Sequence, residues 1–104
     1  MSNMKRLIEN GHYYEVKAIA PTVYQLSSLT AFNLNTKQLG NGSIVGTAMF
    51  ETEEDAREFL RDRAELYFEN APELHEALSD IECGCLTLDA VTAHIEKIEI
   101  DEDE

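Results

Sequence analysis

Two cysteines and two histidines are the residues of this sequence whose chemistry would be easiest to recognise. Cys83 and Cys85 are separated by Gly84, with His75 before them and His94 after them. Four thiolate and imidazole ligands can hold zinc, but structural sites usually separate paired cysteines by at least two residues. The Cys-Gly-Cys spacing therefore favours two small free thiols near the end of a helix. A small Cys/His metal-binding protein is kept as an alternative.

A catalytic cysteine would need a histidine beside it and an acid to orient that histidine. Cys85 with His94 or His75 would supply the first two groups, but no local signature of a cysteine protease accompanies them. The stretch that begins at Asp80 also departs from a calcium loop, because Cys85 stands where the loop needs glycine and Val91 where it needs glutamate. We therefore expect no enzyme activity, no cofactor and no bound metal.

Charge is the most unusual property of the chain. Its 104 residues include 21 acidic and eight basic side chains, a formal net charge of −13. Residues 1–50 hold two acids and four bases, a net of +2, whereas residues 51–104 hold nineteen acids and four bases, a net of −15. Repulsion on this scale destabilises a compact chain. It indicates either a surface kept soluble by charge or a surface that binds a basic partner.

The acids of the second half recur at helical spacing. Over residues 53–69 they occur about once per turn along roughly 25 Å of helix, a sparser version of the line of phosphates along duplex DNA. Such a surface would be drawn to the basic clefts of proteins that bind nucleic acid. The acids that we expect to bind a partner are Glu54, Glu58, Asp62, Glu65, Glu69, Glu73 and Glu76.

These observations predict a small acidic, non-enzymatic interaction protein that occupies a basic nucleic-acid-binding surface, such as that of a nuclease, as a DNA mimic. In size, acidity and lack of a catalytic motif, the chain resembles the small inhibitors that phages and mobile elements make against host nucleases. This resemblance is one of composition. Eight basic residues are too few to predict direct binding of nucleic acid. A homo-oligomeric assembly protein, for example a homodimer, is the alternative function.

Length and hydropathy predict the domain organisation and the cellular location of the chain. We expect one domain over residues 1–100, followed by a disordered acidic tail at 101–104. No apolar run approaches the length needed to cross a bilayer, and the N-terminal residues lack the apolar core of a signal peptide. We therefore expect a cytoplasmic protein without a membrane partner.

Alternating apolar and polar residues in the first half are typical of strands. We expect strands at 13–20, 23–34 and 44–50, joined by turns into a three-stranded antiparallel meander. Residues 35–43 read as a turn-rich connection between the last two of these strands. For 23–34 a helix is the alternative, with four apolar residues spaced by three: Val23, Leu26, Leu29 and Phe32.

From Glu51 onward the period of the pattern becomes that of a helix. Thr52 is placed as an N-cap, and the apolar stripe behind it predicts a helix over 53–69. A second helix follows Pro72 and stops at Gly84. For 87–100 the spacing of the apolar residues favours a third helix, with a strand as the alternative. The predicted fold class is α+β, a three-stranded antiparallel β-meander followed by two or three α-helices packed on one face.

Overall fold

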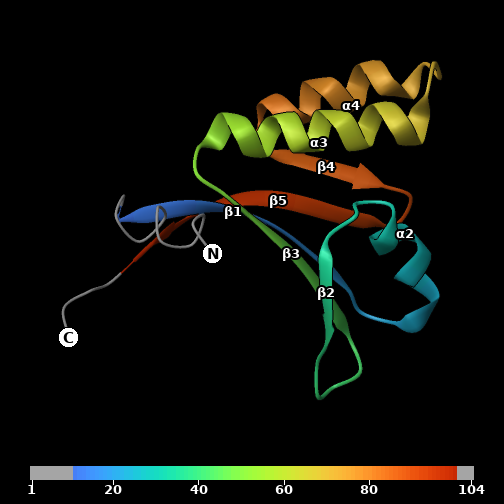
Figure 1. The fold of residues 1–104 in the computed structure, drawn as a ribbon. Coiled ribbons are helices and arrows are strands. Elements are labelled where there is room, and N and C mark those ends of the chain that lie inside the picture. The colour runs from blue at the N-terminus through green and yellow to red at the C-terminus, as the bar shows by residue number, and fades with distance from the viewer. Residues whose placement is uncertain (1–10, 101–104) are drawn as a thin grey trace.

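The computed structural model describes residues 11–100, which form an antiparallel sheet with helices on one face (Figure 1). The α+β class is thus confirmed, while the predicted tail at 101–104 lies outside the described residues. In chain order the elements are β1 (His12–Ala20), the 3-10 helix η1 (Val23–Gln25), α2 (Leu26–Thr30), β2 (Asn35–Gln38), β3 (Ile44–Phe50), α3 (Glu53–Phe68), α4 (Glu73–Glu82), β4 (Cys85–Leu88) and β5 (Val91–Glu99).

The sheet has five strands in the order β2-β3-β1-β5-β4, and every neighbouring pair is antiparallel. The central strand β1 pairs with β3 on one side and β5 on the other, so that Val16 lies opposite both Ala48 and Ile95. Because side chains alternate along a strand, Val16, Ala18 and Ala20 are buried beneath the helices. The fold therefore places the earliest strand at the centre of the sheet.

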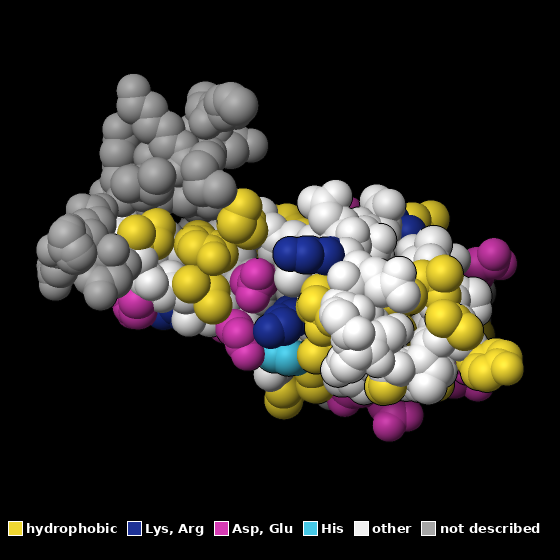
Figure 2. All heavy atoms as spheres, turned by 90° about the horizontal axis from the view of Figure 1, so that it is seen from below, with side chains coloured by type: hydrophobic (Ala, Val, Ile, Leu, Met, Phe, Trp, Pro, Cys, Tyr) yellow, Lys and Arg dark blue, Asp and Glu magenta, His cyan; other side chains and the backbone are white. Residues whose placement is uncertain are grey.

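In Figure 1 both α3 and α4 lie on one face of the sheet, and Figure 2 views the molecule from the opposite, open side. On this open face Lys17 lies across from His94, and Glu15 lies across from Glu96. Figure 2 shows side chains of both charges gathered near the middle of the face. Such alternation of an apolar covered face and a mixed open face is typical of antiparallel sheets.

The predicted three-stranded meander is wrong in its middle strand. The strands expected at 13–20 and 44–50 are both present, but they pair directly with each other, with Ala18 opposite Gly46. Residues 23–30 instead form η1 and α2. Leu29 and Phe32 are three residues apart and both fully buried. A strand would send them to opposite faces, whereas a helical turn brings them to one side.

The connection expected at 35–43 contains a strand of its own. Asn35–Gln38 forms the edge strand β2, which pairs with β3. All four of its residues are exposed, so the sequence shows no buried side and no apolar alternation. Its strand conformation comes from the backbone hydrogen bonds offered by β3.

The helix predicted for 87–100 is also wrong, and the strand alternative is correct in the form of a hairpin. Leu88 pairs with Val91 at the end of the hairpin, and both are buried. Between them the chain reverses at Asp89, whose φ is 59°. The sequence pattern resembled that of a helix because the reversal shifts the apolar alternation by one residue between β4 and β5.

The two helices expected after residue 51 are confirmed. Thr52 caps α3, since its Oγ1 accepts a hydrogen bond of 3.0 Å from the Asp55 N–H. Ala56, Leu60 and Ala64 are fully buried against the core. After α4 the chain turns at Gly84, with a φ of 89°, as a helix C-terminus commonly requires. The two helices lie side by side over one face of the sheet (Figure 1).

Candidate protein interaction surface

The negative charge of the described chain is concentrated in the helical layer. Residues 51–82 hold twelve acids and three arginines, a net of −9, whereas residues 11–50 hold one acid and two lysines, a net of +1. Because α3 and α4 cover one face of the sheet (Figure 1), this difference along the sequence becomes a difference between regions of the surface.

The outer face of α3, defined here as Glu58, Asp62, Glu65 and Glu69, is one continuous group of acids. The spacing of Glu58, Asp62 and Glu65 places these three on one side of the helix, opposite the buried Leu60. Glu69 follows directly after the last helical residue as the C-cap of α3, with a φ of 54°. All four are exposed. Among the described residues, none of the four belongs to an ion pair. The face therefore presents uncompensated negative charge. Asp55, in the first turn of α3, is also exposed.

Glu54 differs from the other predicted acids of α3. One of its carboxylate oxygens lies 3.3 Å from Arg57 Nη1 and the other lies 3.0 Å from Arg61 Nη2. The arginines also reach Glu53, at 2.9 Å, and Glu82, at 3.9 Å. These exposed pairs add little stability, but they neutralise charge, so Glu54 belongs to a mixed-charge cluster beside the outer face.

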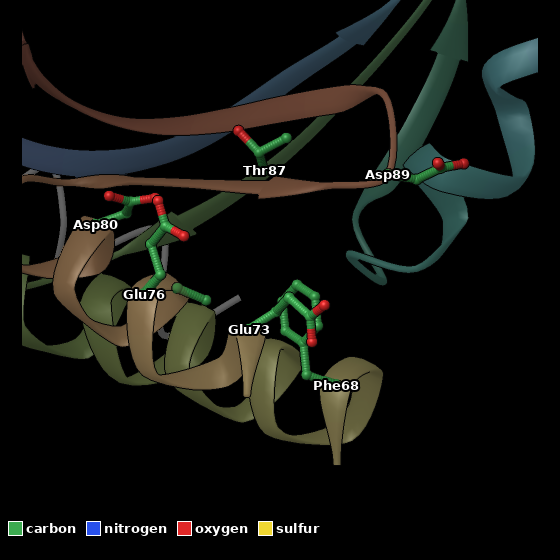
Figure 3. Close-up of a pocket in the computed structure, with 7 residues that line it drawn as sticks. Phe68, Glu73, Glu76, Asp80, Thr87 and Asp89 are labelled. Carbon is green, nitrogen blue, oxygen red and sulfur yellow. The ribbon is translucent and has the colours of Figure 1, made fainter. Parts of the chain in front are cut away.

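Glu73 and Glu76, also predicted as binding residues, lie elsewhere. They line a hollow of about 300 Å³ between α4 and β4, together with Asp80 and Asp89. Figure 3 shows Glu73, Glu76 and Asp80 extending from α4 toward β4, with Asp89 at the far end of the strand. The floor includes Phe68 and Ala77. The seven predicted acids thus divide between two surfaces and the arginine cluster.

Two acids of this hollow were missed by the sequence reasoning. Asp80 follows Glu76 by four residues, a spacing that shows the two on one side of a helix and was available in the sequence. Asp89 reaches the hollow only because residues 85–99 form a hairpin. There its Oδ2 accepts a hydrogen bond of 2.8 Å from the Ser28 hydroxyl, which ties the β4–β5 turn to α2.

The residues considered for metal or thiol chemistry do not come together in one site among the described residues. Cys83 and Cys85 are free thiols, and Cys85 Sγ lies 3.8 Å from the carbonyl oxygen of Asp80. Cys85 is the register partner of His94, but His94 Nε2 lies 3.0 Å from Glu96 Oε2. His75 is exposed on α4. Within residues 11–100, no three His, Cys, Asp or Glu side chains are grouped so that they could hold a metal ion.

The geometry therefore defines a small α+β protein with an acidic helical layer. In comparisons with protein-family models, curated proteins and solved structures, no significant match to this chain was found. None of the helices in the described part of the chain is long and apolar enough to cross a membrane.

Proposed function

We propose that this chain is a non-enzymatic binding protein whose outer face of α3 docks on a basic protein surface that nucleic acid otherwise occupies. The observation that carries the proposal is the run of four exposed acids on one side of α3, none of them in an ion pair among the described residues. A basic partner would supply the positive charges that these four acids do not meet among the described residues of this chain.

The spacing of the charges supports a nucleic acid as the molecule that is imitated. From Glu58 to Glu65 the helix rises roughly 11 Å, so the three helical carboxylates occur about every 5 Å, and Glu69 adds a fourth acid at the C-cap. One strand of DNA carries a phosphate about every 3.4 Å. The outer face of α3 therefore resembles a short, slightly diluted length of one strand, which suits a cleft that binds a single strand or one backbone of a duplex.

The acids also work against the stability of the helix that carries them. Like charges three or four residues apart on a helix destabilise it by about 0.2–0.5 kcal/mol per pair. Glu58 with Asp62 and Asp62 with Glu65 are two such pairs within α3. The three arginines of the helical layer bind elsewhere, at Glu53, Glu54, Glu82 and the Ala31 carbonyl. The arrangement lowers the stability of the helix, whereas it would favour binding to a basic surface.

Three triple variants of equal net charge test the proposal. E58Q/D62N/E65Q changes the outer face of α3, E73Q/E76Q/D80N changes the hollow, and E15Q/E96Q/E99Q changes the sheet. Each variant shifts the net charge from −13 to −10. Proteins captured from cell lysate at low salt are identified by mass spectrometry, and their affinities for each variant are then measured.

The expected partner is a basic nucleic-acid-binding protein. High salt and competing DNA should each release it from the chain. We expect the α3 variant to lose affinity by about tenfold or more, because steering by charge changes association rates by about 10- to 1,000-fold. The other two variants should stay within about threefold of the unchanged protein, since distant charges are screened. Equal losses in all three would show that net charge alone matters, and a loss confined to the hollow variant would move the site to α4.

A further inference from the structure

One long stretch of this chain has no charged residue of its own. Residues 18–36 contain no Asp, Glu, Lys or Arg, although a stretch of nineteen residues at the overall charged content of 28% would hold about five. This stretch comprises the end of β1, then η1, α2 and the start of β2. We call it the uncharged corner. The net charge of −13 therefore comes entirely from the rest of the chain.

Large apolar side chains reach the solvent at this corner. Eight large hydrophobic residues are exposed among the described residues, and four of them fall within eight consecutive positions: Ile19 at 46%, Val23 at 60%, Tyr24 at 92% and Leu26 at 40%. None of the residues of η1 is buried. Figure 2 shows hydrophobic side chains among uncharged surface at the end of the molecule where Figure 1 places α2.

The backbone beneath these side chains is firmly attached to the fold. Leu29 and Phe32 are fully buried, and the Ser28 hydroxyl donates to Asp89 Oδ2 at 2.8 Å. On the other side, Arg63 Nε donates a hydrogen bond of 3.2 Å to the Ala31 carbonyl. The exposed apolar residues are therefore held outward by an ordered scaffold, which lowers the entropy lost when such a surface binds.

We propose that the uncharged corner is the contact through which two copies of this chain associate. A two-fold contact brings a patch against itself, so any unpaired charge in the patch would meet its own copy. Residues 18–36 contribute no charge of their own, and the two charged groups that touch them, Asp89 and Arg63, are each hydrogen-bonded to the corner, so the exposed apolar residues can meet their own copy without an unpaired charge between them. A contact between two copies of the acidic helical layer would add local repulsion to that of the net charge of −13. Depletion of charge together with an exposed tyrosine, Tyr24, is also the composition of an interface core.

Other occupants fit this corner less well. A basic partner of the kind proposed for α3 gains no charge attraction from an uncharged surface. Nucleic acid and anionic membranes are repelled by the chain as a whole and find no cation in residues 18–36. Four exposed side chains make a small contact, so the dimer belongs to the weak end of the range of specific interfaces.

The salt dependence of this contact separates it from the function proposed for α3. Added salt screens the repulsion between two acidic chains, so self-association strengthens with salt. Binding of a basic partner weakens with salt for the same reason. The two proposals can therefore fail independently, because the first predicts that partner binding weakens with salt and the second that self-association strengthens with salt.

Sedimentation velocity of the full chain tests the contact. With rising concentration toward about 1 mM, in the range of weak association, the mass should move from 11.7 kDa toward twice that value, and further at high salt. V23S/Y24S should shift the dissociation constant upward by about tenfold or more, as loss of central interface residues does. L66S is the matched control, since Leu66 is 64% exposed on α3, and it should leave the constant within about twofold.

Two results would overturn the proposal. One is a chain that stays monomeric at the highest concentration in both low and high salt. The other is a dimer whose dissociation constant V23S/Y24S leaves unchanged, because the contact would then lie elsewhere. A circular dichroism spectrum and an unfolding curve of V23S/Y24S that match the unchanged protein would show that the substitution acts on the contact and not on the fold.

Discussion

The outer face of α3 and the uncharged corner are attached to the same hydrophobic core but present opposite chemistry to the solvent. Beneath the first lies the buried Leu60, and beneath the second lie the buried Leu29 and Phe32. One surface carries four acids without an ion-pair partner among the described residues, and the other is built from a stretch without charged residues. A shared core thus positions two surfaces whose binding should respond to salt with opposite signs.

The largest expected effect tests whether the two regions form one cooperative unit. Phe32→Ala should destabilise the protein by about 3–5 kcal/mol, because it leaves a cavity beside Leu29 in the core. Urea unfolding followed by circular dichroism and by tyrosine fluorescence should give coincident single transitions. Leu66→Ala, on exposed surface, should change stability by less than about 0.5 kcal/mol. Two separate transitions in the unchanged protein would show that the corner unfolds independently of the α3 layer.

A smaller effect tests how closely the corner is packed on the sheet. A Cβ at Gly46 would lie 3.0 Å from Leu34 Cβ and 3.3 Å from Leu29 Cδ1. Gly46→Ala should therefore destabilise by about 1–3 kcal/mol through overpacking. Gly40→Ala is the control, because no atom lies within 4 Å of a Cβ there, and it should be neutral or slightly stabilising. If both variants behave alike in thermal unfolding, the close packing between β3 and the corner is not present.

The smallest effect concerns the hydrogen bond that joins the corner to the β4–β5 turn. Ser28→Ala removes the donor to Asp89 and should destabilise by about 1–2 kcal/mol, since the acceptor is charged and the donor Ser28 is buried. Ser27→Ala is the matched control on the same helix, and Ser27 is exposed. Both variants gain the helix propensity of alanine, so the difference between their unfolding free energies isolates the hydrogen bond. No difference would mean that the corner does not depend on this tie.

The sequence was sufficient where one residue pattern allowed one structure. The Thr52 cap and the buried stripe of Ala56, Leu60 and Ala64 predicted α3 because a helix and no other element brings those positions together. It was insufficient at residues 23–34 and 87–100, where the apolar spacing fitted both a helix and strands. There the choice depended on distant partners, namely the space that Gly46 leaves for Leu29 and the pairing of β5 with β1.

The residues of the candidate site were likewise predictable only in part. Glu58, Asp62, Glu65 and Glu69 could be grouped in advance, because helical periodicity is local information. Neutralisation of Glu54 by Arg61 at 3.0 Å could not be distinguished from other pairings in a sequence with so many acids. The contribution of Asp89 to the hollow was also beyond local patterns, since the hairpin that places it was predicted as a helix.

By itself the sequence determined the charge of each segment and the run of nineteen uncharged residues, because these are properties of composition. It also determined the two long helices, whose capping and periodicity are set within a few turns. Only the tertiary structure decided which charged residues share a surface. It alone turned 23–30 into a helical corner and 85–99 into a hairpin. The physical reason is that strand pairing and core packing are contacts between residues far apart in the chain, and their energies outweigh local preferences.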